Sequence, residues 1–258
     1  MDDLCRRGFL AIIPAAAFIP ATTTNSQIGE APGSFPRQEA EVVREMVGAS
    51  HANLARVKEL VKARPALARA AWDWGFGDWE TALGAASHAG NKEIASVLLA
   101  AGAHPTIFSA AMLGQVEIVK AFVMASPGIQ GTRGPHGISL LDHARAGDAS
   151  EVERYLTSLG DAAPRYPNEP LIEGDPAALL GSYLFGREPA DTLTVSTNAR
   201  GMLVMKRDGE SAQNLFHHGG RLFNPSGAEA VRIRFEPASG RAATVMVADG
   251  PLQVRAVR

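Results

Sequence analysis

The feature that most constrains the fold is a helix–turn–helix pattern repeated through the middle of the chain. Four segments align on the turn between two helices, with turn residues Ala52, Gly90, Gly114 and Gly147. These turns are separated by 38, 24 and 33 residues. After the second turn, Ile94 and Leu98 begin an apolar stripe at helical spacing, which a single helix pair cannot bury alone. The pattern predicts helix pairs stacked on one elongated core.

The clearest copy runs from Glu80 to Pro105 and carries a resemblance. Thr81 and Leu83 match the ankyrin pattern Thr-Pro-Leu-His-x-Ala, whereas Ala82 and Gly84 replace its Pro and His. Residues 74–160 resemble a bacterial exported ankyrin-repeat family. The resemblance implies an α-helical ankyrin-repeat solenoid of about four degenerate repeats over residues 38–161. An ordinary helical bundle with coincidental glycine turns is the alternative.

The last part of the chain has a different composition. A proline-rich linker over residues 162–176 precedes residues 177–258, where short apolar stretches alternate with turn signals such as Asp208-Gly209. The expected strands are 181–185, 192–197, 202–207, 214–218, 221–223, 231–236, 243–248 and 252–257. This spacing predicts a small antiparallel β meander curled into a barrel or half-barrel. The whole chain is therefore expected to be an α+β protein of two domains.

The opening Leu180-Gly181-Ser182-Tyr183 and the order of the later strands carry a second resemblance. They are similar to the small β accessory domain found after β-lactamase-like and peptidase domains of bacterial exported proteins. That resemblance implies an accessory role and does not imply hydrolase activity.

Residues 1–24 have the pattern of an export signal. Arg6-Arg7 and Phe9-Leu10 precede a short apolar stretch, an order that resembles the twin-arginine type. Residues 25–37 are expected to be a flexible linker, and the mature protein to be periplasmic or secreted. A tail with two chance arginines is the alternative. Cys5 is the only cysteine and lies inside this segment, so disulfides and cysteine metal sites are excluded from the mature chain.

A partner site is expected where aromatic residues gather. All three tryptophans, Trp72, Trp74 and Trp79, lie within eight residues, with Phe76 between them. Tryptophan dominates interface hot spots, and the ankyrin resemblance implies binding through finger tips and the adjoining concave face. The alternative is that these rings cover the protein's own core. A second, glycine-rich finger carries Arg133 and His136, and its alternative is an ordinary tight turn.

Catalytic, metal and cofactor motifs are absent from the sequence. It contains no Gly-x-Ser-x-Gly, Ser-x-x-Lys, His-Glu-x-x-His or Gly-x-x-x-x-Gly-Lys, and its seven histidines are scattered. His88 is expected to bond to the backbone near its turn, and the adjacent His217 and His218 to be surface imidazoles. We therefore expect no enzyme, no cofactor and no metal site. An enzyme would need a site such as His136 with Asp142.

The predicted function is a non-catalytic module that binds a protein partner. The net charge of −2 argues against nucleic acid or an anionic membrane surface as the partner. We expect a monomer with no membrane span in the mature chain. The alternative is a small apolar-ligand carrier that uses the C-terminal β-barrel.

Overall fold

Short, capped helices form the first part of the described chain. The computed structural model describes residues 33–162 and 176–258. Five helices begin at a side chain that accepts a hydrogen bond from a backbone N–H of the first turn, namely Asn53, Thr81, Asn91, Thr106 and Ser139. Such a cap satisfies one of the N–H groups that the helix itself leaves unpaired. The local sequence therefore determines where these helices start.

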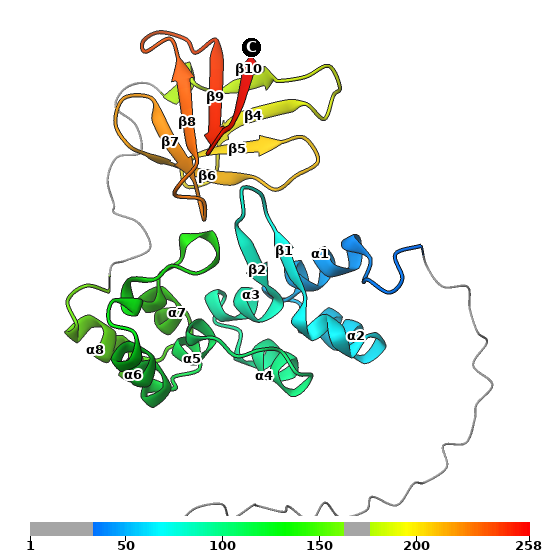
Figure 1. Ribbon diagram of the computed structural model, residues 1–258, viewed down its shortest axis with the longest axis vertical. Coiled ribbons are helices and arrows are strands. Elements are labelled where there is room, and N and C mark those ends of the chain that lie inside the picture. Colours follow the sequence, from blue (N-terminus) through cyan, green and yellow to red (C-terminus); the bar gives the residue numbers. More distant parts are fainter. Residues whose placement is uncertain (1–32, 163–175) are drawn as a thin grey trace, which may run out of the picture. The chain divides into compact units, whose positions relative to one another are not determined.

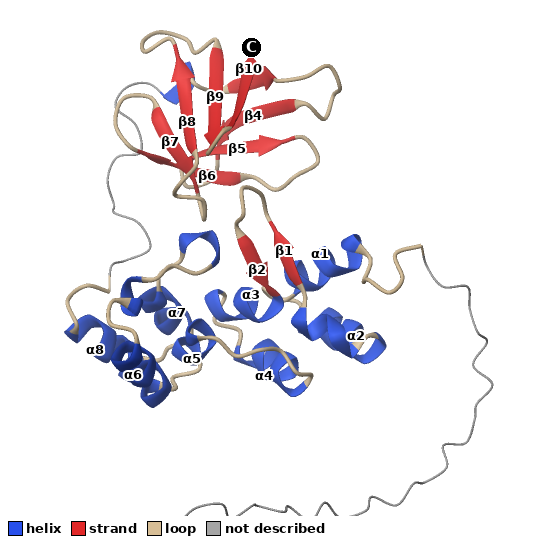
Figure 2. Ribbon diagram, in the orientation of Figure 1, coloured by secondary structure: helices blue, strands red, loops and turns tan. Residues whose placement is uncertain are grey.

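The α-helices are α1 (Ala40–Ala49), α2 (Leu54–Ala63), α3 (Ala82–His88), α4 (Lys92–Ala100), α5 (Ile107–Met112), α6 (Val116–Ala125), α7 (Leu140–Ala146) and α8 (Ser150–Ser158) (Figure 1). The short 3-10 helices are η1 (Pro65–Arg69), η2 (Ile129–Gly131), η3 (Pro135–Gly137) and η4 (Pro176–Ala178). Strands β1 (Ala71–Asp73) and β2 (Trp79–Thr81) form an antiparallel hairpin between α2 and α3. Figure 2 shows this hairpin as the pair of strands among the helices.

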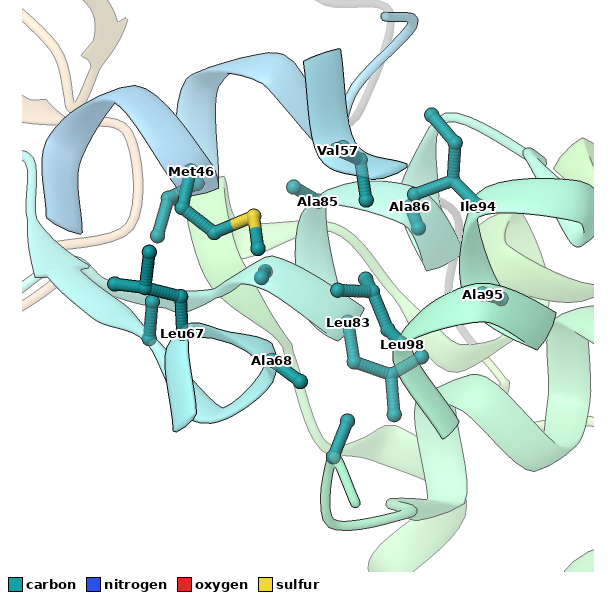
Figure 3. Close-up of a cluster of buried hydrophobic side chains, with 14 of the residues drawn as sticks. Met46, Val57, Leu67, Ala68, Leu83, Ala85, Ala86, Ile94, Ala95 and Leu98 are labelled. Carbon is teal, nitrogen blue, oxygen red and sulfur yellow. The ribbon is translucent and has the colours of Figure 1, made fainter. Parts of the chain in front are cut away.

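The first four helices share one apolar core. Met46 of α1, Val57 of α2, Leu83 of α3 and Leu98 of α4 are all fully or almost fully buried in it (Figure 3). Alanines on α3, such as Ala85, let its neighbours approach closely, because they add little side-chain volume. A second cluster of buried apolar residues is built on α5 to α8.

Two glycines of the repeated turns are required by close backbone contacts. A Cβ atom on Gly90 would clash with the carbonyl oxygen of Ala146, and one on Gly147 would clash with the carbonyl oxygen of Met112. Gly90 also has a φ of 71°, which L side chains rarely adopt. These glycines let the ends of α3, α5 and α7 meet.

The predicted ankyrin-repeat solenoid is wrong. The eight helices of residues 33–162 are only six to ten residues long, and they do not form an evident ankyrin stack. The segments between successive helix pairs also differ: η1 and a β-hairpin follow α2, a six-residue connection follows α4, and two 3-10 helices follow α6. A solenoid needs structurally equivalent units, so that each unit offers the next the same face. The unequal turn spacing reflects units that are not equivalent.

The strands of the C-terminal part form a closed antiparallel barrel. They are β3 (Gly181–Leu184), β4 (Thr192–Thr197), β5 (Leu203–Arg207), β6 (Gln213–His217), β7 (Leu222–Pro225), β8 (Arg232–Glu236), β9 (Thr244–Asp249) and β10 (Leu252–Val257). Their order around the barrel is β10-β3-β4-β5-β6-β7-β8-β9. The predicted strand segments are confirmed to within two residues.

The sheet closes into a full barrel, one of the two forms predicted, and this corrects the half-barrel alternative. The first and last strands pair through Leu184 and Val257, which joins the two edges of the sheet. Closure removes the exposed edges that an open sheet leaves. Inside the barrel, the rings of Tyr183, Phe223 and Phe235 are fully or almost fully buried, with Phe223 and Phe235 packed edge to face. The predicted two-domain ankyrin-plus-meander fold is thus replaced by short helices followed by a closed eight-stranded barrel.

Several predicted segments lie outside the described residues. The export signal of residues 1–24 is one of them, as are most of the linker of residues 25–37 and most of the proline-rich linker of residues 162–176. The described residues between Gln38 and Arg258 belong to one compact unit.

Candidate functional site

The β1–β2 hairpin positions most of the functional side chains in the first part of the chain. Its register pairs Trp72 with Glu80 and Asp73 with Trp79. At its turn, Gly75, Phe76 and Gly77 all have positive φ angles. The glycines adopt this conformation without strain, whereas Phe76 is an uncommon residue there. The hairpin brings Trp74 and Glu80 together, because the Trp74 Nε1–H donates to the Glu80 carboxylate.

Glu80 lies at the centre of a cluster of three histidines. His51 comes from the turn between α1 and α2, His88 is the last residue of α3, and His136 belongs to η3. Each of the four side chains offers one atom that could bind a metal ion, an imidazole nitrogen or a carboxylate oxygen. These four atoms all lie within 4.8 Å of one another. We call these four residues the His-Glu cluster.

The imidazoles face the two oxygens of the buried carboxylate. His88 Nε2 lies 2.7 Å and His136 Nε2 lies 3.4 Å from Glu80 Oε1, and His51 Nε2 lies 3.5 Å from Glu80 Oε2. The Glu80 side chain is fully buried, whereas the side chain of His51 is 34% exposed. Solvent therefore does not reach the Glu80 carboxylate, and it reaches the cluster at His51.

Neighbouring groups hold these side chains in place. His136 Nδ1 lies 2.7 Å from Asp78 Oδ2, and the backbone N–H of His136 donates to Asp78 Oδ1 at 2.8 Å. His51 Nδ1 donates to the carbonyl oxygen of Gly48 at 3.0 Å. The Trp74 Nε1–H donates to Glu80 Oε2 at 2.8 Å. Each contact orients a group of the cluster from outside it.

The contacts within the cluster determine its charges. Burial alone would raise the pKa of Glu80, but hydrogen bonds from His136 and His88 outweigh it and lower that pKa to about 2. Burial alone would lower the pKa of His136, but its bonds to the Asp78 and Glu80 carboxylates raise it to about 9. Burial also lowers the pKa of His88, and there it outweighs the opposing effect of Glu80.

An apolar pocket of about 400 Å³ lies beside the turn of the hairpin. Gln213 of β6 joins this turn to the barrel, because its Nε2 donates to the carbonyl oxygens of Trp74 and Gly75 at 3.3 and 3.2 Å. The aromatic and aliphatic lining residues are Trp72, Trp74, Phe76, Phe185, Leu193, Met205, Val247 and Val254. The polar ones are Asp73, Arg207, Glu210, Ser211 and Gln213, together with the backbone of Gly75. We call this site the hairpin pocket.

The predicted partner-binding residues are distributed over three places. Trp72, Trp74 and Phe76 are half-buried at the hairpin pocket. Trp79 is 63% exposed and does not line the pocket. His136 belongs to the His-Glu cluster. Arg133 is exposed and donates to the carbonyl oxygen of Gly137 at 3.1 Å, within its own loop.

The sequence prediction missed the His-Glu cluster. His51, His88 and His136 are separated by 37 and 48 residues and follow no metal-ligand spacing. His88 binds the Glu80 carboxylate, although a backbone partner was expected for it. The sequence suggests His136 with Asp142, whereas in the structure His136 contacts Asp78 and Asp142 accepts a hydrogen bond from Ser139. The sequence offers only a weak signal in Asp78-x-Glu80, two acidic residues in an aromatic segment, and the structure shows that both are buried.

Among the helices of the described ranges, none is both long and apolar enough to cross a bilayer. Comparison with protein-family models and with curated proteins finds no match for the chain.

Proposed function

We propose that the protein binds a small, largely apolar molecule in the hairpin pocket. The observation that carries this proposal is the lining of the pocket, where aromatic and aliphatic side chains from the hairpin and the barrel surround about 400 Å³. Small-molecule sites are concave and mostly apolar, span about 300–1,000 Å³ and contain a few polar groups that fix orientation. The hairpin pocket has each of these properties.

The closed eight-stranded barrel is compatible with a small-ligand carrier. Barrels of this size have an interior that is either filled by side chains or just able to hold one small ligand. Here Tyr183, Phe223 and Phe235 occupy the interior. We therefore place the ligand at the hairpin pocket on the barrel, where Leu193, Met205 and Val254 contribute apolar surface.

The polar lining indicates what kind of molecule fits. Asp73 and Glu210 disfavour an anionic ligand near them, and Arg207 is already engaged, since its Nε donates to the carbonyl oxygen of Ala190 at 2.9 Å and its Nη2 lies 3.5 Å from Asp191 Oδ1. Ser211 supplies a neutral hydroxyl group. A neutral, ring-containing molecule with one or two hydrogen-bonding groups matches this lining, because aromatic faces stack well on rings.

This proposal describes binding without a catalytic step, in a protein exported by the signal expected in residues 1–24. The structure supports a protein partner at Trp72, Trp74 and Phe76 less well than a small molecule. Its ankyrin basis is wrong, and these three side chains are half-buried. Half-buried rings offer a partner less surface than the free finger tips that this reading needs.

The test uses the full chain and N-phenyl-1-naphthylamine, an apolar fluorophore without charge, as the pocket lining requires. Titration should enhance its emission at one site per chain, with quenching of tryptophan emission from Trp72 and Trp74. Val254→Arg puts a long charged side chain in place of an apolar lining residue and should weaken binding at least about tenfold, because it takes up space and removes apolar surface that a neutral ligand needs. Leu252→Arg is the matched control, since Leu252 lies on the same strand, is 60% exposed and does not line the pocket.

Native mass spectrometry of the purified protein tests independently for a bound small molecule. A co-purified small molecule in the wild type that is missing from Val254→Arg supports the proposal. Equal fluorophore binding by both arginine variants, together with no co-purified molecule, would refute it.

A further inference from the structure

We propose that His51, Glu80, His88 and His136 form a binding site for one divalent transition-metal ion of the zinc class. This inference is independent of the hairpin-pocket proposal. It rests on the convergence of three imidazoles and one carboxylate from four different segments of the chain.

The distances suit an ion of that size. Ligands held about 2.0–2.1 Å from one zinc ion in a tetrahedron lie about 3.3 Å from one another. The distances from the Glu80 oxygens to the three Nε2 atoms are 2.7, 3.4 and 3.5 Å. All pairs in the cluster lie within 4.8 Å, so the imidazoles need to approach one another by at most roughly an ångström and a half. Side-chain rotation can supply such a movement.

Two of the imidazoles already have the orientation that metal ligands need. In proteins, a ligating histidine donates its second N–H to a carboxylate or a backbone carbonyl, which fixes its tautomer. His136 makes this bond from Nδ1 to Asp78, and His51 makes it from Nδ1 to the carbonyl of Gly48. Both bonds leave Nε2 directed at the cluster. The Trp74 N–H orients the carboxylate in the same way.

A purely structural ion pair does not account for the cluster as well as a metal does. One buried carboxylate needs one opposite charge, whereas three imidazoles lie around Glu80. The ring centroids of His51 and His88 are 4.9 Å apart, and those of His88 and His136 are 5.3 Å apart, so the three imidazoles crowd around a single carboxylate. A divalent cation accounts for this crowding, because all three rings in their neutral form can bind it together with the carboxylate.

The ligand types indicate the class of ion. Imidazole suits zinc, copper, nickel and iron, whereas calcium and magnesium prefer sets of oxygen ligands. Three nitrogen ligands with one carboxylate oxygen therefore favour Zn²⁺ or Co²⁺ over Ca²⁺ or Mg²⁺. The exposed edge of His51 gives the ion a route from solvent.

The test begins with the chelator-treated full chain and two probes, Zn²⁺ and Co²⁺. Calorimetric titration with Zn²⁺ should give one site per chain, and an excess of Mg²⁺ should not compete. Co²⁺ should produce the visible absorption bands of a tetrahedral complex. Zn²⁺ should also raise the unfolding temperature, since a ligand that binds only the folded state stabilises it.

Substitutions then locate the site. His51→Gln removes the most exposed ligand of the cluster, so it should leave the metal-free fold intact and abolish the cobalt bands. Asp78→Asn keeps all four ligands but weakens the orientation of His136, and it should reduce affinity by about 10–100-fold. His104→Gln, at an exposed histidine outside the cluster, is the matched control and should bind like the wild type.

Circular dichroism of each metal-free variant checks the fold, and His51→Gln remains decisive if Glu80→Gln does not fold. Absence of Zn²⁺ and Co²⁺ binding by the wild type would overturn the inference. So would equal affinity in the wild type and His51→Gln, because the ions would then bind other surface histidines.

Discussion

The histidines of the helical part and those of the barrel differ in how their spacing in the sequence relates to their contacts in the structure. His217 and His218 are adjacent in the chain, yet His217 Nε2 contacts the carbonyl oxygen of Gly220 and His218 Nε2 contacts Asn224 Oδ1. By contrast, His51, His88 and His136 are far apart in the sequence and meet on Glu80. His217 is the last residue of β6 and His218 follows it, and their contacts are local, whereas helices and turns can bring distant residues together. Proximity in sequence is therefore no guide to which histidines converge in this protein.

The two regions also differ in what their interiors contain. The barrel interior is apolar and filled by rings such as Phe235. The helical part buries the carboxylates of Asp78 and Glu80 beside its apolar core. Buried apolar packing stabilises a fold directly, whereas a buried charge is tolerated only with partners. We infer that the barrel interior serves stability and that the His-Glu cluster serves binding.

The largest expected effect is on the barrel. Phe235→Ala removes a ring that is 1% exposed and packs against Tyr183 and Phe223. It should lower the free energy of unfolding by about 3–5 kcal/mol, measured by urea denaturation. Metal affinity should be unchanged where the variant is folded. A loss below about 1 kcal/mol would show that the barrel interior is not tightly packed.

Glu80→Gln should have the next largest effect. The change removes the charge that three imidazoles surround, and it should destabilise the metal-free protein by about 3 kcal/mol, because a buried pair loses one partner. Urea denaturation of wild type and variant, both treated with chelator, gives the difference. Glu59→Gln, at a surface carboxylate whose side chain is 66% exposed, is the control and should change little.

The stability of the metal-free protein should depend on pH on both sides of neutrality. The pKa of Glu80 is about 2, below its ordinary 4.5, so its stabilisation is complete above about pH 4.5 and is lost as the pH falls towards 2. The pKa of His136 is about 9, above its ordinary 6.5, so its stabilisation is complete below about pH 6.5 and is lost as the pH rises through 9. The lowered pKa of His88 adds to the loss on the acid side.

Unfolding temperatures measured across this pH range test the assignment. His136→Asn should remove the loss on the alkaline side and leave most of the loss on the acid side. An unchanged alkaline profile in this variant would contradict the role given to His136.

The smallest effect is expected at the adjacent histidines of the barrel. His217→Gln removes one contact to the carbonyl oxygen of Gly220, at a site near the surface. It should change the free energy of unfolding by less than about 0.5 kcal/mol and leave Zn²⁺ affinity as in the wild type. If His217→Gln lost Zn²⁺ binding and His51→Gln kept it, the metal site would lie in the barrel and not at the His-Glu cluster.

The sequence alone located the local elements well. Turn signals and alternating apolar residues marked all eight barrel strands, and capping residues such as Thr81 and Ser139 mark the starts of helices. These features depend on residues a few positions apart, so local sequence carries them. The sequence predicts a protein-binding site in the aromatic segment from Trp72 to Trp79, and this stays a prediction.

Only the tertiary structure decided how these elements assemble. Closure of the barrel depends on the pairing of Leu184 with Val257, and the His-Glu cluster depends on four segments meeting at Glu80. The ankyrin prediction was wrong because similar helix turns were taken for equivalent units. Local propensity acts over a few residues, whereas closure, stacking and ligand convergence depend on contacts between residues far apart in the chain. A single sequence holds no local pattern for such contacts.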